Sequence, residues 1–264
     1  MVALAAGKRD TAAGRLTGLL TAIVTPFRDG ELDEAAFAAL AERQIAAGVQ
    51  GLVVATGAAG EAATLRPEEV ERLIRLSVQV AGRRILIVAD VSSNATAATI
   101  VRLRRAQDLG ADAALVTAPW CNRPSQEGIC RHYEAVADAA ALPILVGNEP
   151  VRCRVDIAVD TLRRLAALPG IVGLVDFSGD PTRIGAVMDA CPDWALLCGD
   201  DPSSLGHRVY GGHGAVSLTW ARTAAGASTP TELTPTRTPR RSATSSSFWP
   251  SRSCRPSSRS PSVR

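Results

Sequence analysis

Short apolar runs alternate with longer amphipathic segments along the chain from about residue 20 onward. Each run is rich in β-branched residues and ends in a polar or glycine-containing turn. Continuous apolar runs of this kind are typical of parallel strands that are buried on both faces. The pattern predicts eight strands, at Thr21–Pro26, Gly51–Thr56, Arg84–Ala89, Ala113–Pro119, Pro143–Gly147, Ile171–Val175, Trp194–Cys198 and Ala215–Thr219.

The amphipathic segments between these runs have the composition of helices. In one of them, Thr64 is a candidate N-cap, Pro67 falls in the first turn and acidic residues follow, which is the usual chemistry of a helix start. The predicted helices are Asp33–Ala47, Thr64–Val80, Asn94–Leu109, Ser125–Ala140, Asp156–Ala167 and Asp180–Cys191.

Eight strands that alternate with helices predict an α/β fold of the TIM (β/α)8 barrel type. The chain length of 264 residues suits one such domain, because barrels of this kind need about 250 residues. An open, doubly wound sheet is the structural alternative. A dinucleotide-binding sheet of that kind has a glycine-rich turn after its first strand, and the sequence Thr25-Pro26-Phe27 contains no glycine.

The alternation stops near Trp220, and a different composition follows. Of the 44 residues in 221–264, 32 are Ser, Thr, Pro or Arg, so almost nothing remains to bury. We therefore expect an N-terminal tail at 1–15, a barrel at 16–220, and a disordered low-complexity tail at 221–264 in place of the eighth helix and any C-terminal helical region. A frameshift in a GC-rich gene would produce such a switch, and a genuine basic interaction tail is the rival hypothesis.

Charge and cysteine content exclude several classes of protein. The chain carries a net charge of +3, but residues 221–264 hold eight Arg and one acid, so the body is mildly acidic and does not resemble a nucleic-acid-binding domain. The six cysteines have neither zinc-site nor disulfide-framework spacing, and no metal or cofactor is expected. No apolar run approaches the roughly 18 residues of a membrane span, and the N-terminus lacks the order of a signal peptide. We expect a cytoplasmic protein.

Several strings at the predicted strand ends resemble motifs of the dihydrodipicolinate synthase / N-acetylneuraminate lyase family, in the correct order. The string Asn122–Gly128 is identical to the family's N-R-P-S-Q-E-G, and Gly57–Glu61 is similar to its G-T-T-G-E loop. The other matching strings are Ala22–Pro26, the N-x-P-x-R set Asn148, Pro150 and Arg152, Gly199–Asp201, and Gly211–Ser217.

This resemblance implies an aldolase-type lyase built on a (β/α)8 barrel. In the family, a lysine at the end of strand six forms a Schiff base with pyruvate. A tyrosine after strand four and a threonine of the G-T-T-G-E loop relay protons. Main-chain N–H groups of that loop hold the substrate carboxylate, and an arginine after strand five orients the second substrate. Most members are homotetramers, so the resemblance also implies a homo-oligomer.

The chain departs from the family at the residues that carry this chemistry. Where the family reads I-I-G-I-K-E-A-T-G, this sequence places Val175 at the lysine position. A Schiff base needs a primary amine, and the only lysine of the chain is Lys8, in the predicted N-terminal tail. The relay tyrosine is replaced by Cys121, and the loop threonines are Ala58 and Ala59.

Part of the binding apparatus is nevertheless retained. The loop N–H groups at Ala58 and Ala59 do not depend on the side chains, and the guanidinium of Arg152 can bind a carboxylate through two hydrogen bonds. With Val216, these residues are the candidate substrate-binding positions. We expect weak, noncovalent binding of pyruvate or another small keto acid, unless Arg152 only pairs with a surface acid.

Three functions remain open from the sequence. The first is a non-catalytic homologue, either a pseudoenzyme or the product of a decayed or truncated gene. The second is an enzyme whose chemistry needs no Schiff base, with Cys121, Glu61 and Asp176 as candidate acid, base or nucleophile. The third is a regulatory subunit that joins active relatives in mixed oligomers.

Overall fold

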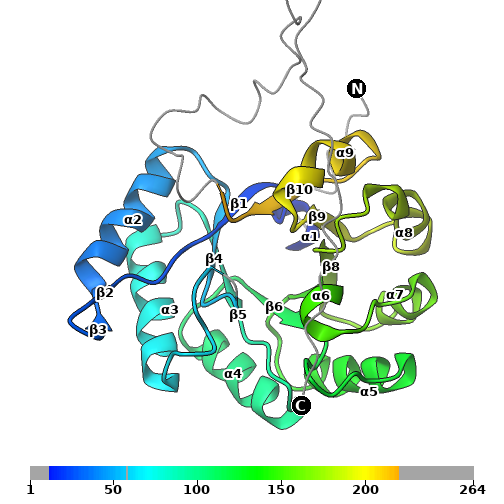
Figure 1. Cartoon of the computed structure of the whole chain (residues 1–264), viewed down its shortest axis with the longest axis horizontal. Helices are drawn as coiled ribbons and strands as arrows, with labels where there is room; N and C mark the ends of the chain where they lie inside the picture. Colours follow the sequence, from blue (N-terminus) through cyan, green and yellow to red (C-terminus); the bar gives the residue numbers. More distant parts are fainter. Residues whose placement is uncertain (1–11, 58, 220–264) are drawn as a thin grey trace, which may run out of the picture. The chain divides into compact units, whose positions relative to one another are not determined.

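The computed structural model describes residues 12–57 and 59–219, and within them the eight predicted strands close into one barrel (Figure 1). All neighbouring strands of the barrel are parallel, which confirms the predicted (β/α)8 architecture. In order around the barrel, the strands are β1 (Gly18–Ala22), β4 (Gly51–Val54), β5 (Leu86–Asp90), β6 (Ala113–Thr117), β7 (Ile144–Asn148), β8 (Ile171–Asp176), β9 (Ala195–Cys198) and β10 (Gly214–Ser217).

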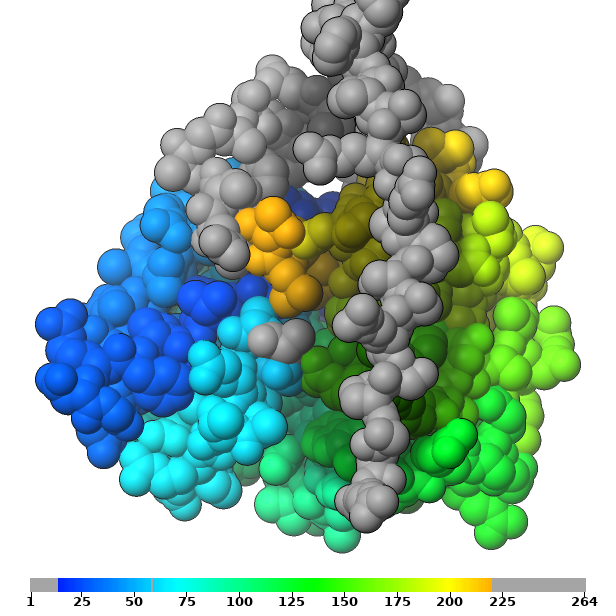
Figure 2. All heavy atoms as spheres, in the orientation of Figure 1, coloured from blue at the N-terminus to red at the C-terminus, as the bar shows by residue number. Residues whose placement is uncertain are grey.

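Helices lie outside the strands and cover the barrel wall (Figure 1). In the space-filling view, the blue and cyan segments of the first half of the chain lie opposite the green segments of the second half (Figure 2). The helices are α1 (Ala12–Arg15), α2 (Glu34–Ala46), α3 (Pro67–Ala81), α4 (Thr96–Asp108), α5 (Gln126–Ala137), α6 (Pro150–Cys153), α7 (Val159–Leu165), α8 (Ile184–Ala190) and α9 (Ser204–Val209).

The first strand lies about three residues earlier than the sequence pattern predicts. β1 begins at Gly18, which pairs with Gly214 of β10, and it ends at Ala22, which pairs with Val53 of β4. The apolar run continues to Pro26, but Thr25 already donates its hydroxyl to the carbonyl of Gly60 and so belongs to the loops above the barrel. A two-stranded hairpin then follows, formed by β2 (Phe27–Arg28) and β3 (Glu31–Leu32).

The start of α3 also differs from the prediction, because Thr64 is not its cap. The hydroxyl of Thr64 donates instead to the carbonyl of Glu61, within the preceding loop. The helix begins at Pro67, with Arg66 as N-cap, and the carboxylate of Glu69 accepts from the backbone N–H of Arg66 at 2.7 Å. A proline in the first helical position loses no hydrogen bond there, which explains why the helix starts at this point.

Two apolar clusters hold the barrel together, one between the strands and the helices and one inside the strands. The outer cluster includes Phe37 and Tyr133, whose side chains are fully buried. The inner cluster consists mainly of Ala, Val and Leu, with no fully buried aromatic side chain. Small and branched side chains suit the narrow interior of an eight-stranded barrel, which is a packed core and not a pore.

Several expectations concern residues beyond those that the structure describes. Lys8, Ala58, the expected tail at 221–264 and the position of the eighth helix all fall there. Residues 12–15, assigned to the N-terminal tail from the sequence, form the helical turn α1, which contacts β8. Among the described residues, no helix has both the length and the apolar character needed to cross a membrane.

Candidate functional site at the barrel mouth

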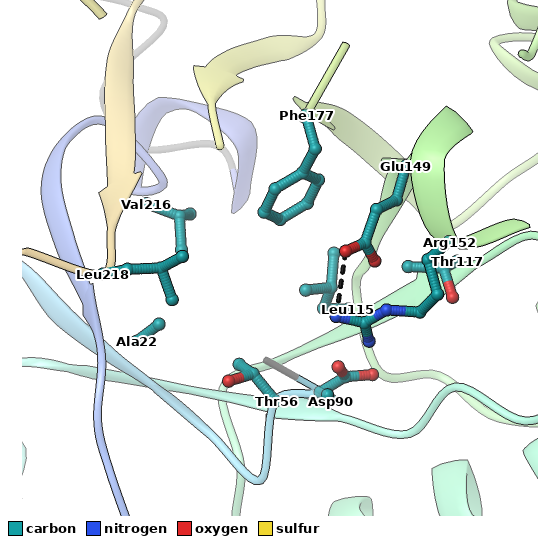
Figure 3. A pocket seen from close by; sticks show the side chains of 11 residues that line it. Ala22, Thr56, Asp90, Leu115, Thr117, Glu149, Arg152, Phe177, Val216 and Leu218 are labelled. Atoms are coloured by element: carbon teal, nitrogen blue, oxygen red, sulfur yellow. Dashed lines mark ion pairs between the residues drawn. The ribbon is translucent and has the colours of Figure 1, made fainter. Parts of the chain in front are cut away.

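A small cavity of about 50 Å³ opens where the strands end at their carboxyl termini (Figure 3). Side chains at this end of a (β/α)8 barrel come from several different strands and meet over the same space, which is where barrel enzymes place their chemistry. The lining residues are Ala22, Thr56, Gly57, Asp90, Leu115, Thr117, Glu149, Arg152, Phe177, Val216 and Leu218.

Arg152 is the central charge of the cavity. It projects from α6, a single helical turn whose first residue is Pro150 and which directly follows β7. Its Nη2 lies 2.9 Å from Oε1 of Glu149, and its guanidinium lies between the carboxylates of Glu149 and Asp90 in Figure 3. Arg152 is therefore paired with an acid of the protein, but this acid lines the cavity and is not the surface acid of the alternative expectation.

Asp90 is the last residue of β5, and its carboxylate accepts several hydrogen bonds. Its Oδ1 accepts hydrogen bonds from the backbone N–H of Ser92 at 3.0 Å and from the Ser92 hydroxyl, and the backbone N–H of Gly57 also donates to the carboxylate. Burial raises the pKa of Asp90, while these hydrogen bonds and the positive charge of Arg152 act in the opposite direction. A buried carboxylate is tolerable only with such partners.

Glu149 is a second, mostly buried carboxylate at the same mouth. Burial raises the pKa of Glu149, Arg152 opposes this shift, and the neighbouring charge of Asp90 adds to it. Two carboxylates therefore share one guanidinium in a region of low dielectric, where unlike charges attract strongly and like charges are costly.

The remaining walls of the cavity are mainly apolar. Leu115, Val216 and Leu218 contribute aliphatic surface, and the ring of Phe177 faces the same space (Figure 3). Thr117 is the polar exception. Its side chain is buried, and its Oγ1 forms no regular hydrogen bond within the described part of the chain, but it interacts with the thiol of Cys153 and opposes the rise in the pKa of that group.

Val175, at the position where the resemblance places the family's lysine, lies on the interior face of β8 but deeper than the cavity, and it does not line the cavity. Its side chain is fully buried in the inner apolar cluster, and it pairs with Gly147 of β7 and Leu197 of β9. Phe177 follows two residues later on the same face and lines the cavity in its place. Its backbone N–H donates to Asn148, so the parallel ladder continues past the end of β8 and fixes this alternation.

The other residues singled out from the sequence do not all meet at the cavity. Arg152 and Val216 line it, and Ala59 packs beside the inner cluster. Cys121 is exposed, with a backbone φ of 65°, and Glu61 is exposed with a φ of 54°. Asp176 is buried, but its Oδ1 accepts from Asn148 at 3.0 Å, away from the cavity lining.

Three important lining residues, Asp90, Glu149 and Phe177, were missed by the sequence analysis. Asp90 offers the clearest signal, because it is a charged residue directly after the apolar run Leu86–Ala89. A charge at the carboxyl end of a barrel strand points toward the mouth. Glu149 stands between two residues of the N-x-P-x-R pattern and could have been found in the same way. No His, Cys, Asp and Glu side chains form a potential metal site within residues 12–57 and 59–219.

Comparison with known proteins identifies the relatives of this barrel. Residues 15–228 match the model of the dihydrodipicolinate synthetase family. A 4-hydroxy-tetrahydrodipicolinate synthase of Phenylobacterium zucineum is 51% identical over 203 residues, which are 76% of this chain and 69% of that protein.

Solved structures of two synthases share the fold. The 4-hydroxy-tetrahydrodipicolinate synthase of Methylacidiphilum fumariolicum has a TM-score of 0.77 and 39% identity, covering 79% of this chain and 70% of that one. The chloride-inhibited dihydrodipicolinate synthase of Acinetobacter baumannii, complexed with pyruvate, has a TM-score of 0.76 and 39% identity, covering 78% and 71%. With its closed parallel barrel and its motifs at the strand ends, the chain belongs to the dihydrodipicolinate synthase family of lyases.

Proposed function

We propose that this chain is a non-catalytic member of its family, one that cannot form a Schiff base with pyruvate. The observation that carries the proposal is Val175, a hydrocarbon side chain fully buried on the interior face of β8, where the family motif has its lysine. The described residues include no lysine at all, since the only lysine of the chain is Lys8.

No other side chain at the cavity can take the place of the amine. Schiff-base formation requires an uncharged primary amine that attacks the carbonyl carbon, and the resulting carbinolamine then loses water. The basic side chain present is the guanidinium of Arg152, which is not a primary amine and is paired with Glu149. Loss of the nucleophile alone removes most of the rate acceleration in enzymes whose catalytic groups act as a unit.

The positions that would assist the reaction support the same proposal. Cys121, at the position of the relay tyrosine, is exposed and does not line the cavity. Ala59 has no hydroxyl to pass a proton. The alternative of an enzyme without a Schiff base, acting through Cys121, Glu61 and Asp176, is less well supported. None of these three residues is part of the lining of the described cavity.

The cavity itself is retained, and Arg152 and Val216 remain candidate binding residues beside Ala59. Noncovalent binding of pyruvate or another keto acid stays a prediction. A ligand carboxylate would have to compete with Glu149, which already holds the guanidinium at 2.9 Å. A homo-oligomer, a regulatory partnership with an active relative and a cytoplasmic location also stay predictions.

The decisive experiment is reduction in the presence of pyruvate. The full chain is incubated with pyruvate and treated with borohydride, and the mass of the intact protein is measured by mass spectrometry. The Phenylobacterium zucineum synthase is the positive control. We expect no added mass on this chain. A reduced adduct that maps to Lys8 and disappears in Lys8→Arg would overturn the proposal.

A further inference from the structure

We propose that the mouth cavity binds a small organic cation, such as a protonated primary amine, in preference to a keto-acid carboxylate. This inference rests on the proposed function, because a lyase that works through a pyruvate imine must admit the keto acid at this place. It goes further by naming the charge of the ligand that the remaining side chains suit.

One N–H of the loop that follows β4, that of Gly57, already donates to a carboxylate of the protein. The backbone N–H of Gly57 donates to Asp90, and the Ser92 N–H and hydroxyl bind the same side chain. When ionised, Asp90 is therefore an internal anion at the mouth. A second carboxylate placed beside it would meet like-charge repulsion in a poorly solvated site, which is costly.

The arginine is also already engaged. Nη2 of Arg152 is 2.9 Å from Glu149, and its guanidinium packs so closely on Gly57 that a Cβ there would lie 1.5 Å from Nη1. With Asp90 and Glu149 facing one guanidinium, the charged groups that line the cavity carry an excess of negative charge when ionised. An ammonium group balances that excess, and a carboxylate would increase it.

The uncharged walls suit an ammonium ion with a short alkyl chain. The buried Oγ1 of Thr117 forms no regular hydrogen bond in the described structure, although its side chain interacts with the Cys153 thiol, and it can accept a hydrogen bond from an ammonium group. The ring of Phe177 offers an aromatic face to a cation, and Leu115 and Val216 offer apolar contact. The cavity volume is about 50 Å³, and because one water needs roughly 10–15 Å³, the ligand has only a few heavy atoms.

Ethylammonium is a suitable probe, tested on the full wild-type chain. Isothermal titration calorimetry with ethylammonium chloride is compared with sodium pyruvate and with sodium chloride at equal ionic strength. We expect saturable binding of ethylammonium in the millimolar range, and weaker binding of pyruvate under the same conditions. The melting temperature of the protein should rise with added ethylammonium and stay unchanged with added sodium chloride.

Isosteric variants locate the binding. We expect Glu149→Gln and Asp90→Asn each to weaken ethylammonium binding by about tenfold or more, since each removes a charge-assisted interaction. Glu68→Gln, which changes an exposed carboxylate in the first turn of α3, is the matched control and should bind like the wild type. If Asp90→Asn fails to fold, Glu149→Gln and the wild-type titrations still decide the question.

The inference is overturned if ethylammonium gives no saturable heat, if pyruvate binds more tightly, or if Glu149→Gln leaves ethylammonium affinity unchanged. The borohydride experiment is independent of these titrations. A covalent pyruvate adduct would refute the proposed function, whereas the absence of both the adduct and ethylammonium binding would refute only the cation site.

Discussion

The guanidinium of Arg152 rests directly on the backbone of Gly57, a residue 95 positions earlier in the chain. A Cβ added at Gly57 would lie 1.5 Å from Nη1, so Gly57→Ala must push the side chain of Arg152 away from Glu149. Because the obstacle is the end of a flexible side chain, we expect a loss of about 1 kcal/mol in the free energy of unfolding. Urea unfolding followed by circular dichroism measures this loss.

A double-mutant cycle shows whether the loss comes from this contact. In an Arg152→Ala background, Gly57→Ala should cost almost nothing, which gives a coupling energy of about 1 kcal/mol. Gly185→Ala is the control. Gly185 lies within α8 and has open space around its would-be Cβ, so alanine there should stabilise the chain by up to about 1 kcal/mol. Equal costs of Gly57→Ala in both backgrounds would contradict the contact.

His132 should make the stability depend on pH. The residue is buried on α5, and burial lowers the pKa of His132 from 6.5 to about 4. The neutral ring is therefore favoured in the folded state. Its contribution to stability is complete above the unfolded pKa of 6.5 and is lost as the pH falls toward about 4. Between pH 7 and pH 5, linkage predicts a loss of about 2 kcal/mol in the free energy of unfolding.

The measurement compares the wild type with His132→Leu at both pH values. The variant loses the hydrogen bond between Nδ1 and the hydroxyl of Thr96, at 2.9 Å, so it should be less stable at pH 7. Its further loss on going to pH 5 should be smaller than that of the wild type by about 2 kcal/mol. A parallel pH dependence of the two proteins would assign the effect to other groups.

Replacement of His207 should raise the stability at pH 7, whereas replacement of His132 should lower it. Its side chain is 2% exposed, and neither ring nitrogen has a hydrogen-bond partner in the described structure. Burial lowers the pKa of His207, and the unpaired polar atoms are a cost in the folded state. We expect His207→Leu to raise the free energy of unfolding by about 1 kcal/mol at pH 7. A clear loss of stability would show that the ring makes a polar contact that matters.

Asn148 joins three segments above the barrel wall. Its Nδ2 donates to Asp156 at 2.8 Å and to Asp176 at 3.0 Å, while its Oδ1 accepts from the backbone N–H of Ile157. The side chain is fully buried, so Asn148→Ala leaves several polar groups unpaired and should cost about 3 kcal/mol.

Asn122→Ala is the matched control for this change. Asn122 is exposed and makes one hydrogen bond, to the carbonyl of Asn94 at 2.7 Å. Its loss should cost less than about 1 kcal/mol, because water replaces the missing partner. Similar costs for the two alanine variants, measured by urea unfolding, would mean that the buried network contributes little to stability.

The architecture of this protein was determined by its sequence. Apolar runs such as Ala113–Thr117 can only be buried on both faces, and eight of them alternating with amphipathic helices leave a closed parallel barrel as the simplest way to cover them. The motif resemblance also placed Arg152 and Val216 at the strand ends, and both line the cavity.

The charge and depth of the site were decided only by the tertiary structure. Nothing in the sequence pairs Asp90 with the backbone of Gly57, or shows that Phe177 lines the mouth while Val175 lies below it. Side chains alternate between the two faces of a strand, so their height in the barrel depends on where each strand sits against its neighbours. That register is fixed by barrel closure, a relation among all eight strands that no local pattern contains.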